Sequence, residues 1–332
     1  MTSRAKVVIT HRVHQPVKEL LSVECEVVAN DDVETWPRSK LLDASRDAAG
    51  LLVFMPDLID DALLAASPNL RVIAAALKGF DNIDVAACTR RGIWVAIVPD
   101  LLTSPTAELA LTLTLGLTRN VLSGDHRVRS GEFKGWRPLL YGDGLVGKTV
   151  GVVGMGKLGQ AFVKMLAGFN VRVLYYDPVP LSPVQDAFLG VARRTLDQLL
   201  AQSDVTVCLA PLTSVSQHKV NEAALRQMRP GSYLVNVGRG SVVDEQAVAL
   251  ALQDGRLAGY AADVFEMEDW ARPDRPARVA PGLLAQAEKT LFTPHLGSAV
   301  KAVRLEIELA AARSILQALR GERPQGAINE VS

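Results

Sequence analysis

The feature that most constrains the fold is a short glycine pattern between an apolar run and a helix-like segment. The apolar run 149–153 is followed by Gly154, Gly156 and Gly159, and the residues after Lys157 have helical spacing. In a strand–turn–helix dinucleotide site, the first glycine allows the tight turn, the second lets the backbone approach a pyrophosphate, and the third lets helix and strand pack closely. The free N–H groups at the helix start favour an anion. The alternative is a glycine turn that only packs a helix on a sheet.

The next apolar run ends at Asp177, near the ~20-residue distance at which an acid binds the adenosine ribose. A carboxylate there repels a 2′-phosphate and therefore predicts NAD. Arg193 and Arg194 follow, and they could bind such a phosphate or stay solvated, so some use of NADP is left open. The predicted cofactor-binding residues are Gly154, Met155, Gly156, Lys157, Leu158, Gly159, Asp177, Pro178 and Asp263.

Short apolar, β-branched runs alternate with segments of helical length along the whole chain. In the first hundred residues these runs are KVVIT, CEVVA, GLLVFM, RVIAAA and IWVAIV. Their near-continuous apolar character is typical of parallel strands that are covered on both faces. A second series follows, with KTVGVVG, VRVLYYD, DVTVCLA, SYLVNV, LAGYAADVF and TLFTPH. The alternation predicts the α/β class.

Three longer segments interrupt or end this alternation. Residues 105–121 are a uniformly apolar helix, which predicts a place in a core or an interface. The polar, glycine-rich stretch 129–148 is a candidate domain junction, and the acidic, proline-containing stretch 267–282 is a predicted loop. Residues 298–321 predict one long amphipathic helix.

Composition excludes several classes of function. The 332 residues carry no net charge, so the chain lacks the basic surplus of a nucleic-acid-binding protein. No apolar segment predicts a signal peptide or a membrane span. Cys25, Cys88 and Cys208 are far apart and show neither metal spacing nor a disulfide framework, which predicts core cysteines in a reducing cytoplasm and no metal site.

Charged and titratable residues follow four of the predicted strands. They are Lys78, Arg239, the acids of ADVFEMED, and His295. The carboxyl ends of parallel strands are where open α/β sheets bind ligands. Arg239, between two glycines, needs an anionic partner, which is either Asp244 in a salt bridge or a substrate anion. Each of the others could be an ordinary surface or satisfied residue. His295 beside a carboxylate could take a proton from a substrate or a water.

In motif order, the chain resembles the D-2-hydroxyacid dehydrogenases over essentially its whole length. The matching motifs are the glycine pattern, NVGRGSVVDE, AADVFEMED and FTPHLGS. The resemblance implies two Rossmann-like domains: a flavodoxin-like substrate domain of residues 1–101 plus 297–332, and a doubly wound parallel NAD-binding sheet of residues 102–296. The family's catalytic arginine, glutamate and histidine fall on Arg239, Glu268 and His295. The glutamate is usually followed by proline, whereas Asp269 and Trp270 follow it here.

Within that family the resemblance is strongest to the members that oxidise phosphite to phosphate with NAD. The segments that carry it are VFMPD, ALKGFDNIDVAACTRRGIW, VPDLLTSPTAELAL, RSGEFKGWRP, GYAADVFEMEDWARPDRP and GSAVKAVRLEIE. It implies a small dianionic substrate, with His295 or Arg239 as the base. The implied substrate-binding residues are Lys78, Gly79, Arg239, Arg304, Met55 and Trp136.

Two other functions stay open. One is an ordinary NAD-dependent dehydrogenase of D-2-hydroxy acids, in which Arg239 would bind the carboxylate. The other is a non-catalytic, NAD-sensing binding protein. The resemblance also implies a homodimer through the helix that starts near Pro105, although a helix buried within one chain would have the same composition.

Overall fold

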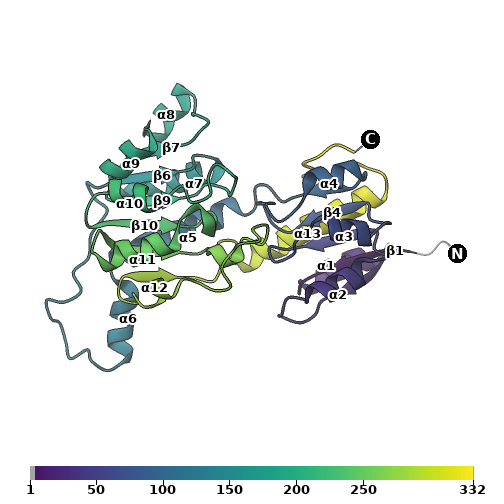
Figure 1. Ribbon diagram of the computed structural model, residues 1–332, viewed down its shortest axis with the longest axis horizontal. Coiled ribbons are helices and arrows are strands. Elements are labelled where there is room, and N and C mark those ends of the chain that lie inside the picture. The colour runs from purple at the N-terminus through teal and green to yellow at the C-terminus, as the bar shows by residue number, and fades with distance from the viewer. Residues whose placement is uncertain (1–3, 332) are drawn as a thin grey trace. The chain divides into compact units, whose positions relative to one another are not determined.

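The computed structural model describes residues 4–331, which form two compact units. The first unit contains the residues up to Leu102, Trp270–Pro273, and the residues from Ser298 onward; the second contains Thr103–Asp269 and Asp274–Gly297. Each has its own parallel sheet with helices on both faces (Figure 1). The α/β prediction is therefore confirmed. Among residues 4–331, no helix is long and apolar enough to cross a membrane.

The sheet of the first unit has the strand order β2-β1-β3-β4-β5, with all pairs parallel. This is the flavodoxin-like order that the family resemblance implies. The strands are β1 (Ala5–Ile9), β2 (Cys25–Ala29), β3 (Gly50–Val53), β4 (Val72–Ala75) and β5 (Trp94–Ala96). The helices are α1 (Gln15–Ser22), α2 (Arg38–Ser45), α3 (Asp61–Ala66), α4 (Val85–Arg90) and α13 (Lys301–Leu319).

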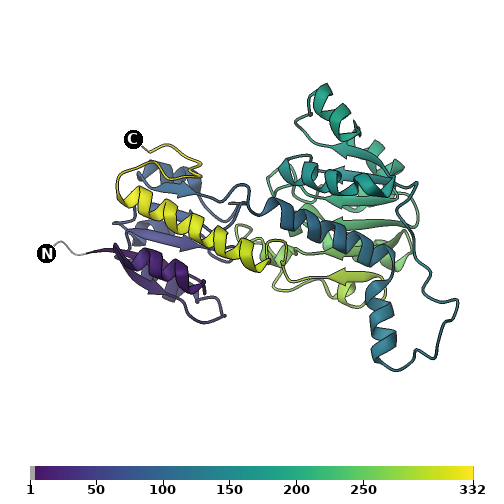
Figure 2. The same ribbon diagram turned by 180° about the vertical axis from the view of Figure 1, so that it is seen from behind.

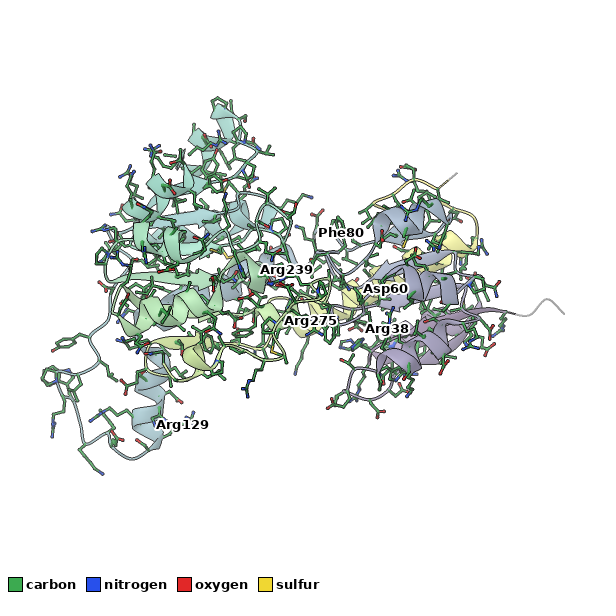
Figure 3. The ribbon with its side chains drawn as sticks, viewed as in Figure 1. Arg38, Asp60, Phe80, Arg129, Arg239 and Arg275 are labelled. Carbon is green, nitrogen blue, oxygen red and sulfur yellow. The ribbon has the colours of Figure 1, made fainter. Side chains whose placement is uncertain are left out.

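Helix α13 covers one face of this sheet and brings the end of the chain back onto its beginning (Figure 2). Every residue of β3 and β4 is buried, as expected for strands covered on both sides. Ile315 of α13 packs closely over Gly50, where a Cβ would lie 3.1 Å from its Cγ2. Asp60 caps α3 and also binds Arg38 of α2, which joins two helices of this unit (Figure 3).

The sheet of the second unit has the order β12-β11-β10-β9-β6-β7-β8, again all parallel. This is the doubly wound order, and it reverses between β6 and β9. The strands are β6 (Thr149–Val153), β7 (Arg172–Tyr176), β8 (Val191–Arg193), β9 (Val205–Cys208), β10 (Ser232–Asn236), β11 (Leu257–Ala262) and β12 (Thr290–Phe292).

The helices of the second unit include two with capping boxes, in which Ser182 and Thr195 bind the amide of the residue three positions on. The helical elements of this unit are α5 (Thr103–Thr118), α6 (Val121–Arg129), α7 (Lys157–Met165), η1 (Leu166–Phe169), α8 (Pro183–Leu189), α9 (Leu196–Gln202), α10 (Glu222–Gln227), η2 (Gly240–Val242), α11 (Glu245–Gln253), η3 (Glu266–Glu268) and α12 (Pro281–Leu284).

Three predictions about these elements need correction. The long helix is interrupted at Asn120, whose φ of +53° belongs to the left-handed region that asparagine tolerates, and α6 starts afresh at Val121. The stretch 129–148 is not a domain junction, because it lies wholly inside the second unit. The predicted loop 267–282 contains part of η3 and the start of α12.

Candidate active site

The glycine turn that follows β6 has the geometry of a pyrophosphate cradle. Gly154 has φ +99°, and a Cβ there would lie 2.8 Å from the amide nitrogen of Ala210. A Cβ on Gly159 would lie 2.3 Å from the carbonyl oxygen of Gly154. At Gly156, the N-cap of α7, a Cβ would meet nothing within 4 Å. Two glycines are thus required by the protein's own packing, while Gly156 leaves open space at a helix N-terminus, where a phosphate fits.

These differences give a matched pair of variants. We expect Gly156→Ala to weaken NAD binding about tenfold or more while the melting temperature stays unchanged, because its methyl group enters only the space of the phosphate. Gly154→Ala should instead lower the unfolding free energy by about 1–3 kcal/mol, through its positive φ and the overlap with Ala210. Calorimetry with NAD and thermal unfolding measure the two effects. A stable Gly156→Ala protein with normal NAD affinity would contradict the assignment.

Asp177 directly follows β7 and is fixed beside the glycine turn. Its Oδ2 accepts a hydrogen bond from the amide of Met155 at 2.7 Å, and its Oδ1 accepts one from Val179 at 2.8 Å. The guanidinium of Arg193 donates to the carbonyl oxygens of Asp177 and Pro178 at 3.0 and 3.4 Å. A carboxylate and a cation therefore lie together at the place predicted for the adenosine ribose.

Asp263, the first acid after β11, clamps the loop that carries His295. Its Oδ1 accepts hydrogen bonds from Thr293 Oγ1 and the Leu296 amide, both at 2.6 Å, and its Oδ2 accepts one from the Gly297 amide at 2.8 Å. Burial raises the pKa of the Asp263 carboxyl, although these donors favour its charged form. Binding of the cofactor by Asp263 stays a prediction; the contacts in the structure give it a second role in holding the histidine loop.

His295 and Glu268 form a hydrogen-bonded pair. His295 Nδ1 lies 2.6 Å from Glu268 Oε2, and the other carboxylate oxygen accepts the amide of Phe265 at 2.8 Å. An ionised carboxylate only accepts, so this contact places a proton on Nδ1, and Nε2 is the acceptor in the neutral form of the ring. The ring is about one-third exposed. The pair therefore has the geometry of a general base with an orienting acid.

The backbone at His295 is also unusual. Its φ is +56°, a left-handed value that costs a non-glycine residue about 1–3 kcal/mol. Its amide donates to the carbonyl oxygens of Asp263 and Thr293 at 2.9 and 3.1 Å, which holds the turn in place. The protein thus maintains a strained backbone to aim this imidazole.

Arg239 follows β10 in a turn that permits no side chain on either neighbour. A Cβ on Gly238 would lie 2.5 Å from the Ala210 carbonyl oxygen, and one on Gly240 would lie 1.9 Å from the carbonyl carbon of Phe265. The close approach of Gly240 to Phe265 brings the arginine turn directly against η3, which carries Glu268. Figure 3 labels Arg239 beyond the end of its strand. Asp244, the alternative partner, caps α11 by accepting the Ala247 amide at 3.0 Å.

The first unit presents its own cations at the carboxyl ends of its strands. Lys78 and Gly79 follow β4, and Met55 follows β3. All three are partly buried. Arg304 lies near the start of α13, where its guanidinium donates to the carbonyl oxygen of Ala76 at 3.4 Å, at the end of β4. Lys78, Gly79, Met55 and Arg304 are thus grouped at one edge of the first sheet.

Trp136, also a predicted site residue, lies on the surface of the second unit. It is 76% exposed and lies on the segment between α6 and β6. Together with α6, that segment projects from the second unit (Figures 1 and 2). Its role in the substrate pocket stays a prediction.

Sequence reasoning missed the buried polar residues that hold the loop containing Met55. Asp57 is buried and accepts hydrogen bonds from Thr10 Oγ1 at 2.5 Å and from the Phe54 amide at 2.8 Å, which fixes the Met55 loop. Asn82 Nδ2 donates to the carbonyl oxygens of Phe54 and Asp57 at 3.1 and 2.7 Å. Nothing in their spacing along the sequence marks these polar residues, because they meet only across strands.

The fold and the site define a nucleotide-dependent oxidoreductase, and comparison with known proteins gives the family. Residues 111–297 match the model described as "D-isomer specific 2-hydroxyacid dehydrogenase, NAD binding domain". The chain belongs to the D-isomer specific 2-hydroxyacid dehydrogenase family, and its second unit contains the family's NAD-binding domain. The predictions of the family and of NAD are confirmed.

Relatives and solved structures match along almost the whole chain. A protein named glyoxylate reductase from Thermofilum pendens is 37% identical over an aligned length of 332 positions, which covers 99% of this chain and 95% of that protein. The crystal structure of a Thermus thermophilus protein has a TM-score of 0.87 at 33% identity, covering 98% of this chain and 100% of that one. A structure of an NADPH-dependent glyoxylate/hydroxypyruvate reductase from Sinorhizobium meliloti, in complex with NADP and malonate, has a TM-score of 0.83 at 28% identity and covers 98% and 97%.

Proposed function

We propose that this protein is a phosphite (phosphonate) dehydrogenase, which oxidises phosphite to phosphate with NAD. The observation that carries the proposal is Asp269, which stands where the resemblance leads us to expect a proline. Its buried Oδ2 accepts the amide of Ser241 at 2.7 Å. This bond joins the turn of Arg239 to the turn of Glu268. The position after the glutamate, which is usually proline in the family, is here an aspartate that holds the two turns together, which favours a substrate other than a common hydroxy acid.

The available cations suit a dianion. Phosphite carries two negative charges at neutral pH, so it needs more positive charge than a monocarboxylate. We assign Arg239, Lys78 and Arg304 to the anion: the guanidinium of Arg239 can bind two oxygens with its planar fork, and Lys78 acts as a point charge. The backbone N–H of Gly79 adds a donor. Met55 and Trp136 are assigned to shaping the pocket and excluding water.

His295 is assigned as the base. Its Nε2 takes a proton from the water that attacks phosphorus, and Glu268 stabilises the imidazolium that forms. Arg239 is the other candidate base, because it is assigned to the same anion. Bound NAD supplies the hydride acceptor, so that phosphite, water and NAD give phosphate, NADH and one proton.

The second candidate is a dehydrogenase of small 2-hydroxy acids, such as a glyoxylate reductase. The 37% identity to a protein of that name favours it. There, Arg239 would bind the carboxylate of the substrate, and His295 would exchange a proton with its hydroxyl group. A non-catalytic NAD-sensing protein is a weaker alternative, because Arg239, Glu268 and His295 are all present.

We also propose a homodimer. The projecting segment bears exposed apolar side chains, which a soluble monomer rarely gathers in one place. Those that are at least half exposed are Val121, Leu122, Val128, Phe133, Trp136, Leu139, Tyr141 and Val146. The buried face of α5 packs within its own unit against α7 and β11, so the surface in question is this segment rather than α5 alone.

A substrate panel separates the candidate functions. The purified protein is mixed with NAD and either phosphite, glycolate, D-glycerate or D-lactate, and with NADH and glyoxylate in the reverse direction. We expect rapid NADH formation with phosphite only. Activity on a hydroxy acid or glyoxylate without phosphite oxidation would retain the family and discard the substrate. Bound NAD with no turnover of any compound would favour the sensing protein.

Asp177 should determine the preference between cofactors. We expect Asp177→Asn to raise the ratio of kcat/KM with NADP to that with NAD about tenfold, because repulsion of the 2′-phosphate is removed while Arg193 stays in place. The asparagine side chain has one acceptor oxygen, so it keeps the hydrogen bond from either the Met155 or the Val179 amide and loses the other. Asp197→Asn, on the exposed start of α9, is the matched control. An unchanged ratio in Asp177→Asn would exclude this role.

A further inference from the structure

Arg304 is held on several sides within the first unit. Its Nη1 lies 3.4 Å from both the Ala76 carbonyl oxygen and Ser298 Oγ. Its guanidinium carbon lies 5.6 Å from the centre of the Phe54 ring. Burial lowers the pKa of Arg304, and the neighbouring Glu308 opposes this shift. A cation in this setting needs a buried counter-charge.

Glu308, one turn further along α13, is that counter-charge. It is only 3% exposed. Its Oε1 lies 3.6 Å from Nη2 of Arg304. Its Oε2 accepts the backbone amide of His14 at 2.9 Å and lies 2.8 Å from His14 Nδ1. One oxygen therefore faces the arginine, while the other is anchored by the loop between β1 and α1.

We propose that Glu308 is a positioning residue for substrate binding, which fixes the guanidinium fork of Arg304 at the carboxyl end of β4. This inference rests on the assignment of Arg304 to the phosphite anion in the proposed function. An arginine side chain is long and has many rotamers, and its fork is useful only when it is held in one direction. The anchored carboxylate restricts those rotamers before the anion arrives.

A purely structural role for Glu308 is the competing explanation. In that case the carboxylate serves only to dock His14 and its loop onto α13. His14→Ala removes the ring contact but leaves the pair of Glu308 with Arg304. It therefore isolates the docking role, and it should lower the melting temperature with little change in KM for phosphite.

The test compares Glu308→Gln, Arg304→Ala and their double variant in the full-length protein, with phosphite and NAD as substrates. We expect Glu308→Gln to raise KM for phosphite about tenfold, with KM for NAD nearly unchanged, as when a charge-assisted contact loosens. The double variant should be no worse than Arg304→Ala, because both changes remove the same function. Glu306→Gln, on the exposed side of the same helix, is the matched control and should be silent.

The outcomes separate the inference from the proposed function. If Arg304→Ala binds phosphite normally, the assignment of Arg304 fails and the inference fails with it. If Arg304→Ala raises KM for phosphite while Glu308→Gln behaves like Glu306→Gln, only the inference fails. Two results would overturn the inference and favour the role of docking His14 onto α13. One is a KM for phosphite in the double variant that combines the separate increases of both single variants, and the other is an equal increase of this KM in Glu308→Gln and His14→Ala. If Glu308→Gln does not fold, Glu308→Asp keeps the charge, draws it away from Arg304, and should raise the same KM.

Discussion

Replacing His295 with glutamine is expected to lower kcat by about 10²–10⁴-fold, the usual contribution of a general base. The imidazole Nε2 is the acceptor left available once Nδ1 donates to Glu268. Glutamine fills similar space but cannot take a proton at neutral pH. Steady-state formation of NADH measures the loss. KM for NAD should stay within a small factor, because the glycine turn is unaffected.

The second unit offers a matched control for this change. His218 also has a left-handed backbone, with φ +45°, and its Nε2 lies 2.8 Å from Glu266. Its side chain is 35% exposed, against 32% for His295. The two histidines thus have similar exposure, although Glu266, at 9%, is more buried than Glu268, at 26%, and a different ring nitrogen faces the acid in each pair. His218→Gln should keep nearly full activity, and a comparable loss in both variants would mean that general stability, rather than proton transfer, explains the effect.

Replacing Arg239 with alanine is expected to have the other large effect. Removing one partner of a buried, hydrogen-bonded charge pair costs about 2–5 kcal/mol, which corresponds to a fall in kcat/KM for phosphite of roughly 30-fold to 4000-fold. The turn itself should survive, since Gly238 and Gly240 make its close backbone contacts, while the arginine side chain adds a hydrogen bond to the Gly238 carbonyl oxygen at 3.0 Å. Arg239→Lys keeps the charge without the fork, and it should recover only part of the lost activity.

Arg256 provides the control for Arg239. Its guanidinium donates to the carbonyl oxygens of Arg226 and Met228 at 3.2 and 3.3 Å, just before β11 rather than beyond the end of a strand. Arg256→Ala removes an arginine from the same unit and should leave KM for phosphite unchanged. Normal affinity and turnover in Arg239→Ala would show that the anion is held elsewhere.

Much of the fold could be predicted because strands buried on both faces are readable as apolar runs. CEVVA is β2 in full, and the run that precedes Gly154 is β6. The three-residue strand β8 was missed, since Val191–Arg193 is too short to show a pattern. The break at Asn120 was missed as well, because a single left-handed asparagine leaves the apolar composition of the helix unchanged.

In the candidate site, too, some residues could be predicted from the sequence and others could not. Residues that follow strands can be found from the sequence, since the edge of a parallel sheet collects them: the structure places His295 against Glu268 and the turn of Arg239 against Phe265. The supporting contacts could not be predicted. Glu308 and His14 are 294 positions apart and meet only when α13 returns to the first sheet. The contacts of Asp263 could not be predicted either, because its carboxylate accepts hydrogen bonds from residues some thirty positions later in the chain.

The most direct test of phosphite oxidation follows the phosphorus atom itself. Phosphite and NAD are incubated with the protein in water enriched in oxygen-18, and the product is followed by phosphorus NMR and mass spectrometry beside the absorbance of NADH. We predict phosphate that contains one oxygen from water, with one NADH formed for each phosphate. Phosphite that remains unchanged, while the same preparation reduces glyoxylate, would contradict the proposed substrate.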